Sequence, residues 1–214
     1  MASGVSGVFI TLEGPDGAGK STQAARLAER IRGAGRQVVL TREPGGTGLG
    51  ERIRGVLLLG EPRDPLTDAL LFNSARAELV ATVIRPALKH GAVVVCDRFA
   101  DSTLAYQGYG GGVPIDRLRG IAQVATGGLR PDRTVLFDLP PEAGLRRRAE
   151  GSPASLTRFE SADHHDLDFH RRVRDGYLAL AASESERWRV VDAASDPDAV
   201  AEAAWAAVED LFPG

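Results

Sequence analysis

A glycine-rich loop near the start of the chain restricts the possible folds more than any other feature. It matches the pattern G-x-x-x-x-G-K-S/T in full and consists of Gly14, Pro15, Asp16, Gly17, Ala18, Gly19, Lys20 and Ser21, followed by Thr22. An apolar run typical of a buried strand precedes it at residues 8–12, and residues 21–31 carry one apolar helical face. Such a loop turns successive backbone N–H groups toward a phosphate, beside the positive end of the helix. It predicts nucleoside-triphosphate binding, with Lys20 on the β- and γ-phosphates and Ser21 on Mg²⁺.

Lysine usage supports this interpretation over an accidental glycine-rich turn. Of the 26 Lys and Arg residues, only Lys20 and Lys89 are lysines. A chain that uses arginine almost everywhere keeps the compact ammonium in the loop, where a planar guanidinium would not fit.

The composition limits the class of protein. The 214 residues suit one α/β domain spanning 1–214, and a net charge of −3 argues against a general nucleic-acid or membrane-surface binder. The single cysteine, Cys96, excludes an internal disulfide and lies in an apolar run, which favours a buried side chain over a nucleophile. No apolar run approaches the about 20 residues that span a bilayer. We therefore expect a cytoplasmic protein without a membrane or nucleic-acid partner.

Short apolar runs alternate with helical patterns along the chain. They occupy residues 8–12, 38–41, 93–96, 134–139 and 188–191. Continuous apolar runs of this kind predict a five-stranded parallel sheet with helices on both faces, in which ligands bind at the carboxyl ends of the strands.

Charged residues follow two of these runs. Arg42 and Glu43 come after the second, and Asp97 and Arg98 come after the third. Beside a phosphate loop, Asp97 suits a carboxylate that holds Mg²⁺ or its waters, and Arg98 suits a phosphate clamp. The alternative for either pair is an ordinary ion pair at a strand end.

A long helical pattern runs from residue 65 to about 88, and Pro86 is expected to kink or end it. Phe72 and Arg76 lie four residues apart, so they share one face and suit stacking and hydrogen bonding to a base. The alternative is a core Phe beside a surface Arg. Farther on, residues 151–168 break the apolar periodicity, which predicts a mobile lid at about 150–168 with Arg158 folding over the phosphates.

These motifs together closely resemble the thymidylate kinase family, of P-loop nucleoside-monophosphate kinases. The resemblance rests on blocks in family order, which are residues 13–22, Arg42-Glu43-Pro44-Gly45-Gly46-Thr47, Leu71-Phe72 with Arg76, Asp97-Arg98-Phe99, Ser102-Thr103, Ala105-Tyr106-Gln107-Gly108, Arg158-Phe159-Glu160 and Asp166-Leu167-Asp168-Phe169. It implies transfer of the γ-phosphate of ATP to dTMP for dTTP synthesis, with Mg²⁺ as cofactor, and a homodimer through the helices around residues 65–88.

The resemblance also implies individual roles. Asp16 would accept from the sugar 3′-OH, and Tyr106 would exclude a 2′-OH. Glu43 and Asp97 would organise Mg²⁺. The other implied contacts are Phe72 stacked on thymine, Arg76 on its O4, Thr103 on the base edge, Arg42 and Arg98 on the acceptor phosphate, Ser102 and Gln107 on the substrate, and Arg146 on ATP.

The transferring group needs positive charge in addition to these contacts. Because the loop carries Gly17 and Ala18 rather than an arginine, the chain resembles the class in which the lid supplies it, and Arg158 is the candidate. Arg146 and Arg148 are the fallbacks, because the lid is longer than expected for the family.

Two other functions remain open to the sequence alone. One is a kinase of the same fold that acts on another small acceptor, such as a nucleoside. The other is a nucleotide-gated switch or assembly ATPase, which would hydrolyse ATP without an acceptor. ADP release measured with dTMP, dUMP, dCMP, AMP and thymidine separates the two kinases, and slow ATP consumption that dTMP does not stimulate would favour the switch.

Overall fold

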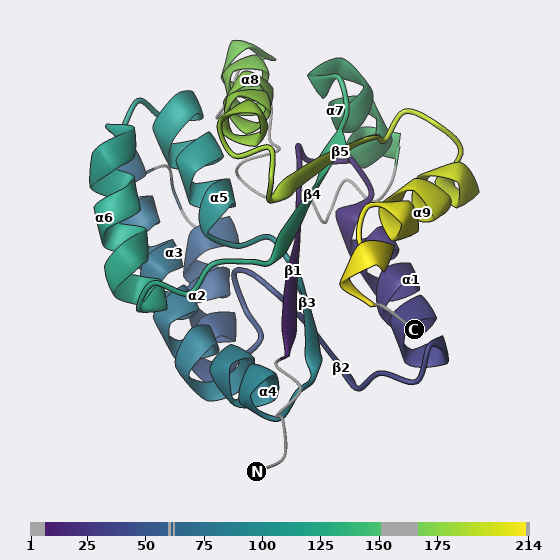
Figure 1. The fold of residues 1–214 in the computed structure, drawn as a ribbon. Helices are drawn as coiled ribbons and strands as arrows, with labels where there is room; N and C mark the ends of the chain where they lie inside the picture. The colour runs from purple at the N-terminus through teal and green to yellow at the C-terminus, as the bar shows by residue number, and fades with distance from the viewer. Residues whose placement is uncertain (1–6, 60, 62, 151–166, 213–214) are drawn as a thin grey trace.

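The protein folds around a parallel sheet of five strands (Figure 1). The computed structural model describes residues 7–59, 61, 63–150 and 167–212. The strands are β1 (Val8–Glu13), β2 (Val38–Arg42), β3 (Val93–Asp97), β4 (Arg133–Asp138) and β5 (Trp188–Asp192). Their spatial order is β2-β3-β1-β4-β5, and every neighbouring pair is parallel. The predicted sheet is confirmed, and each predicted strand agrees to within one residue at either end.

Helices cover both faces of the sheet, as predicted. On one face lie α1 (Lys20–Gly33) and α9 (Pro197–Ala206), at the right of Figure 1. The opposite face carries α2 (Gly48–Leu59), α3 (Pro65–Leu79), α4 (Arg85–Lys89), α5 (Ala100–Thr103), α6 (Ile115–Thr126) and α8 (Leu167–Ser183). Helix α7 (Pro141–Glu150) follows β4 at the end of the sheet near the phosphate loop.

Alternating residues of the strands supply two apolar layers, because successive side chains point to opposite faces of a sheet. Ile10 and Leu12 of β1 pack with residues of α1 and α9, whereas Phe9 packs with the layer below α3 and α4. Cys96 belongs to the second layer and is fully buried, as predicted, and burial raises the pKa of its thiol well above the usual range.

The long helical segment does not end where proline first interrupts its pattern. Helix α3 passes into a π-helical turn, Val80–Ile84, and then into α4, which runs to Lys89 with Pro86 in its first turn. Proline lacks an N–H and its ring crowds the preceding turn, so a widened turn just before it lets the chain continue. Of the two expected outcomes at Pro86, the helix does not end there, and the local distortion takes the form of the π-helical turn just before the proline.

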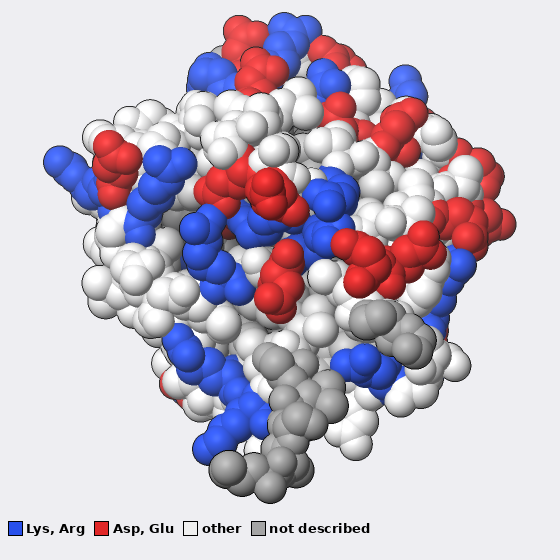
Figure 2. All heavy atoms as spheres, viewed as in Figure 1, with Lys and Arg blue, Asp and Glu red and all other residues white. Residues whose placement is uncertain are grey.

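The C-terminal helix is short. Its apolar pattern extends over residues 196–212, but only α9 is α-helical, and a 3₁₀ turn at Glu209–Leu211 follows. After Phe99 the chain forms α5 and continues as a π-helical stretch, Leu104–Gly110. None of the described helices is long and apolar enough to cross a bilayer. Acidic and basic side chains alternate over the face shown in Figure 2.

Candidate active site

The conformation of the phosphate loop requires glycine, because a side chain would not fit. Gly17 adopts φ +77°, and a Cβ there would lie 2.2 Å from the carbonyl oxygen of Gly144 in α7. Lys20 begins α1 and donates from Nζ to the Pro15 carbonyl, 2.7 Å away, across the loop. Burial and the neighbouring Arg98 lower the pKa of Lys20 to about 8, against the pull of Asp16 and Asp97. Lys20 therefore stays mostly cationic at neutral pH and lies where a bound phosphate would meet it.

Arg98 is the best-anchored cation of the site. It is the one described non-glycine residue with a positive φ, +70°, directly after β3. Its Nη2 donates to Oδ1 of Asp16 (2.6 Å) and to the Tyr106 hydroxyl (3.1 Å). Although burial opposes its charge, the tyrosines and Asp16 around it hold the pKa of Arg98 well above the usual range. A permanent, rigidly held guanidinium of this kind suits an anion in the pocket.

Asp16 and Tyr106 form a second polar pair beside Arg98. The Tyr106 hydroxyl donates to Oδ2 of Asp16 at 2.7 Å, and the guanidinium of Arg98 lies 4.9 Å from the centre of the Tyr106 ring. Burial alone would raise the pKa of Asp16, but Arg98 and Lys20 hold it below its usual range. Asp16 is therefore an ionised acceptor at neutral pH, as contact with a sugar hydroxyl would require.

Two carboxylate oxygens near the loop are buried without a hydrogen bond among the described residues. They are Oδ1 of Asp97 and Oε1 of Glu43. The other oxygen of Asp97 accepts from the Ser21 hydroxyl at 2.5 Å, so Ser21 and Asp97 are directly adjacent. Burial raises the pKa of Glu43, which the charge of Arg76 partly offsets.

Arg76 lies beneath the pocket rather than in its lining. It is 1% exposed, and its guanidinium donates to Oε2 of Glu43 (2.9 Å from Nε), to Asn73 and to the Phe99 carbonyl. Its Nη2 also donates to the Thr103 hydroxyl at 3.2 Å. Arg76 is therefore a buried residue that holds Glu43 and Thr103, which excludes the alternative of a surface Arg, and its contact with the base stays a prediction.

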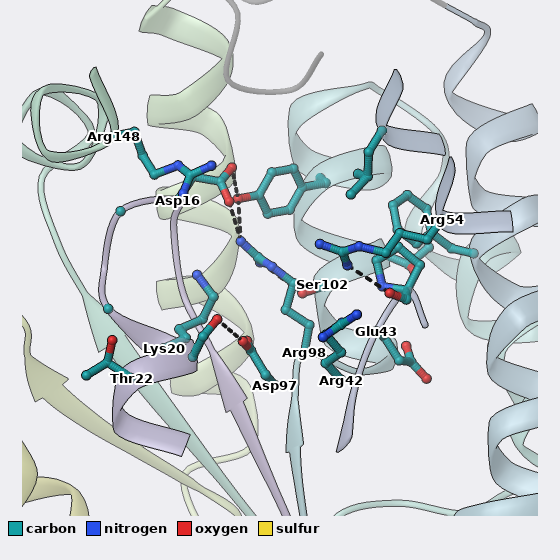
Figure 3. A pocket seen from close by; sticks show the side chains of 18 of the residues that line it. Asp16, Lys20, Thr22, Arg42, Glu43, Arg54, Asp97, Arg98, Ser102 and Arg148 are labelled. Carbon is teal, nitrogen blue, oxygen red and sulfur yellow. Dashed lines mark hydrogen bonds and ion pairs between the residues drawn. The ribbon is translucent and has the colours of Figure 1, made fainter. Parts of the chain in front are cut away.

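The pocket between the phosphate loop and helices α2, α3 and α5 has a volume of about 420 Å³. Four basic side chains point toward the same space in Figure 3: Lys20, Arg42, Arg54 and Arg98. The predicted residues that line it are Asp16, Gly17, Gly19, Lys20, Ser21, Thr22, Arg42, Glu43, Phe72, Asp97, Arg98, Ser102, Thr103, Tyr106 and Gln107. The structure thus brings the expected donor and acceptor residues into one cavity.

Some expected residues are not part of that lining. The side chain of Arg146 is 69% exposed, its Nε lies 4.0 Å from Oε1 of Glu150, and it does not line the cavity, so its contact with ATP stays a prediction. Arg147 and Arg148, one and two positions on, line the pocket instead. Gly14, Pro15 and Ala18 are loop residues outside the lining. Arg158 and most of the expected lid lie outside the described residues, and Leu167 and Asp168 begin α8.

Several residues that line the pocket were not predicted from the sequence. Arg54 on α2 donates to the Pro44 carbonyl (2.8 Å), and Leu58 lies one turn after it. A helix that starts just after the carboxyl end of β2 places one face over the crevice, and the spacing of these two residues is the signal that would have identified it. Arg147 donates from Nη1 to the Ala193 carbonyl (2.9 Å), which joins α7 to the turn after β5.

Comparison with known proteins agrees with this geometry. A family model described as thymidylate kinase matches residues 12–204. The chain is 55% identical over 204 residues to a thymidylate kinase of Thermomicrobium roseum, covering 95% of both chains. It is 52% identical over 208 residues to one of Deinococcus radiodurans, covering 95% of this chain and 97% of that one.

A solved structure shows the same agreement in three dimensions. The crystal structure of thymidylate kinase from Ehrlichia chaffeensis matches with a TM-score of 0.77 at 34% identity, over 95% of this chain and 99% of that one. The chain therefore belongs to the thymidylate kinase family and is a nucleoside-monophosphate kinase that transfers the γ-phosphate of ATP to dTMP.

Proposed function

We propose that the pocket performs this transfer by seating two phosphate groups side by side. The phosphate loop and Lys20 hold the donor, and Arg42 and Arg98 hold the phosphate of dTMP. The observation that carries the proposal is that Lys20, Arg42 and Arg98 line one cavity. Transfer between two anions needs alignment and positive charge, which these three cations supply together.

No catalytic base is needed in this proposal. The attacking phosphate oxygen of dTMP is already ionised at pH 7, so the protein has no proton to remove. Asp97 instead acts on the donor side through its contact with Ser21. A lid arginine, Arg158, remains the candidate for the last positive charge, and Arg148 at the pocket wall is the alternative that the described residues offer.

The residues next to the loop fit Mg²⁺. Ser21 and Asp97 offer oxygen ligands in direct contact, and Oδ1 of Asp97 is buried with no partner among the described residues. Among those residues there is no cluster of three His, Cys, Asp or Glu side chains, which suits an ion held mainly by substrate phosphates and water. When bound, Mg²⁺ would neutralise charge on the phosphates. Glu43 would bind a water of the ion through its unpartnered Oε1.

The base of dTMP would lie against Phe72, which lines the pocket. Thr103 and Gln107 line it too and would offer polar atoms to the base edge. Tyr106 would pack below the sugar, and Asp16 would accept from its 3′-OH by exchanging the Tyr106 hydroxyl for the substrate's. Arg76 would act indirectly in this arrangement, by holding Glu43 and Thr103 in place.

We further propose a homodimer through the α2, α3 and α6 layer. Four apolar side chains on these helices are exposed: Leu49 (41%), Val56 (51%), Leu70 (50%) and Val124 (85%). Light scattering should give twice the mass of the chain for the wild-type protein. For Leu70→Asp it should give the mass of one chain if α3 forms the interface.

A cytoplasmic location follows from the same function, since ATP and dTMP are its substrates.

Arg98→Ala tests the proposed roles most simply. The variant should lose at least about 100-fold in kcat with dTMP, because an acceptor-phosphate contact made in the transition state is gone. Equilibrium titration should leave ATP affinity nearly unchanged. Arg26→Ala is the control, because Arg26 makes an exposed ion pair with Asp198 on the far helix layer. Loss of ATP affinity in Arg98→Ala, with transfer preserved, would contradict the acceptor-side role.

A further inference from the structure

A buried acid lies directly beneath the phosphate loop and has no part in the function described so far. Glu13 is the last residue of β1 and is 0% exposed. It does not line the pocket. A carboxylate this deeply buried is costly unless it is hydrogen-bonded, so its partners indicate what it does.

Glu13 accepts hydrogen bonds from three separate segments that surround the acceptor side of the pocket. The Phe99 N–H donates to Oε1 at 2.7 Å. Both hydroxyls, Ser102 from α5 and Tyr177 from α8, donate to Oε2, at 2.5 and 3.0 Å respectively. The carboxylate therefore ties the turn after β3 to two helices.

The same two hydroxyls accept from Arg98. Its Nη1 lies 3.2 Å from Oγ of Ser102 and 3.0 Å from the Tyr177 hydroxyl, with the Gly14 carbonyl at 3.1 Å as a third acceptor. Each hydroxyl has a single proton. Because that proton is given to Glu13, the hydroxyl oxygens present only lone pairs to the guanidinium.

We propose that Glu13 is a positioning residue for phosphoryl transfer, whose carboxylate sets the Ser102 and Tyr177 hydroxyls as acceptors that fix Arg98. The inference rests on the acceptor-side role of Arg98 proposed above. If Glu13 takes up a proton, it must donate it to a neighbouring oxygen. The displaced hydroxyl hydrogen then turns toward the other hydroxyl, 2.9 Å away, or toward the cationic Arg98. Either outcome weakens the hydrogen bonds that hold the guanidinium of Arg98 in place.

The surroundings place this protonation in the working range of pH. Burial and, to a smaller extent, the charge of Asp101 raise the pKa of Glu13 to about 7, against the Ser102 hydroxyl, Arg98 and the Phe99 N–H. The titratable groups around it are Asp101 on α5, Tyr177 on α8, Lys20 on α1 and Cys96 on β3, besides Arg98. The carboxylate form, and with it the seat of Arg98, is lost as pH falls through about 7.

Glu13→Gln is the first test, assayed as kcat/KM for dTMP from pH 5.5 to 9. We expect a loss of about 100-fold above pH 8, as for a displaced catalytic group, with the KM for ATP nearly unchanged. In Glu13→Gln, the fall of kcat/KM at acidic pH should shrink to the part caused by protonation of the phosphate of dTMP, whose second pKa is about 6. Wild-type values of kcat/KM and an unchanged acidic decline would overturn the proposal.

Asp101→Asn is the matched control, because Asp101 is a buried acid that pairs with Arg187 and does not contact Arg98. Removing the charge of Asp101 should move the fall of kcat/KM at acidic pH to lower pH. The value of kcat/KM above pH 8 should stay roughly unchanged. The titration of dTMP cannot respond in this way, so an unmoved decline would assign the proton to the substrate and overturn the titrating role of Glu13.

Two further variants keep the test decisive. If Glu13→Gln does not fold, Tyr177→Phe combined with Ser102→Ala removes both links and should lower kcat/KM for dTMP alone, whereas unchanged activity would refute the linkage. Arg98→Ala separates this inference from the proposed function. Full activity of Arg98→Ala contradicts the acceptor-side role itself, whereas an inactive Arg98→Ala beside a fully active Glu13→Gln contradicts the positioning role alone.

Discussion

Arginines of this chain differ in what surrounds them, and their surroundings decide their roles. Arg76 is buried and fully engaged by protein acceptors, so it organises other residues. Arg98 donates a hydrogen bond to the buried Tyr177 hydroxyl and still lines the pocket. Arg42 is half-exposed, and its ion pair among the described residues is with Glu51 at 3.1 Å, an easily exchanged surface contact. Residue type alone does not separate these cases.

Arg54 is the residue whose role the sequence analysis missed, and it gives a direct test. Burial and the neighbouring Arg42 lower its pKa, as expected for a cation placed among other cations to receive an anion. Arg54→Ala should raise the KM for dTMP about 10- to 100-fold, the worth of one or two hydrogen bonds to a charged group, and leave the KM for ATP unchanged. Arg52→Ala, an exposed neighbour on the same helix, is the control. Equal effects in both variants would exclude a specific role for Arg54.

Elements of the sheet were predictable because their signal is local. The apolar runs and the turn residues after them gave the strands to within one residue, and the carboxyl ends of β2 and β3 carry the predicted site residues. Which side of a helix faces the pocket was harder to predict from the sequence. Arg146, Arg147 and Arg148 are three identical residues in a row, each turned about 100° from the last, so only the packed structure shows which of them face the pocket.

The burial of Arg76 could not be predicted from local sequence patterns either. Its partners Glu43, Phe99 and Thr103 lie between 23 and 33 residues away in the chain. Similarly, Glu13 and Tyr177 are separated by 164 positions and meet only when α8 packs on the sheet. The phosphate loop itself was predictable because one short segment carries it, and its residues Gly17, Gly19 and Lys20 line the pocket.

Close packing between the phosphate loop and α7 predicts an effect at the level of the element. A Cβ on Gly144 would lie 2.2 Å from the carbonyl oxygen of Asp16, and the backbone cannot yield there cheaply. Gly144→Ala should lower the free energy of unfolding by about 2 kcal/mol or more and weaken ATP binding. Gly120→Ala in α6, where no atom lies within 4 Å, should instead stabilise by up to about 1 kcal/mol. Urea unfolding compares the two, and equal effects would contradict the contact.

At the scale of the whole molecule, the buried carboxylate that organises the acceptor side also makes folding depend on pH. The pKa of Glu13 is raised from 4.5 to about 7, so between these values the folded state binds more protons than the unfolded state. Its contribution to stability is present in full below pH 4.5 and is lost as pH rises through about 7. The ionised form used by the enzyme is thus the less stable one.

Urea unfolding at pH 5, 6, 7 and 8 measures this dependence. Relative to Glu13→Gln, the wild-type free energy of unfolding should fall by about 3 kcal/mol over that range, from the size of the pKa shift. Comparing the two proteins at each pH cancels the other titrating groups. A constant difference would show that Glu13 titrates normally in the folded chain.

In the proposed reaction, donor and acceptor phosphates occupy one cavity, with Lys20 on the donor phosphate and Arg42 and Arg98 on the acceptor phosphate. A compound that joins adenosine to thymidine through five phosphates tests it directly by calorimetric titration. We predict one molecule bound per chain, displaced by ATP and by dTMP alike, and bound far more weakly by Arg98→Ala. If the compound still bound while dTMP occupied its own site, the two phosphates would not share a cavity, and the account would be wrong.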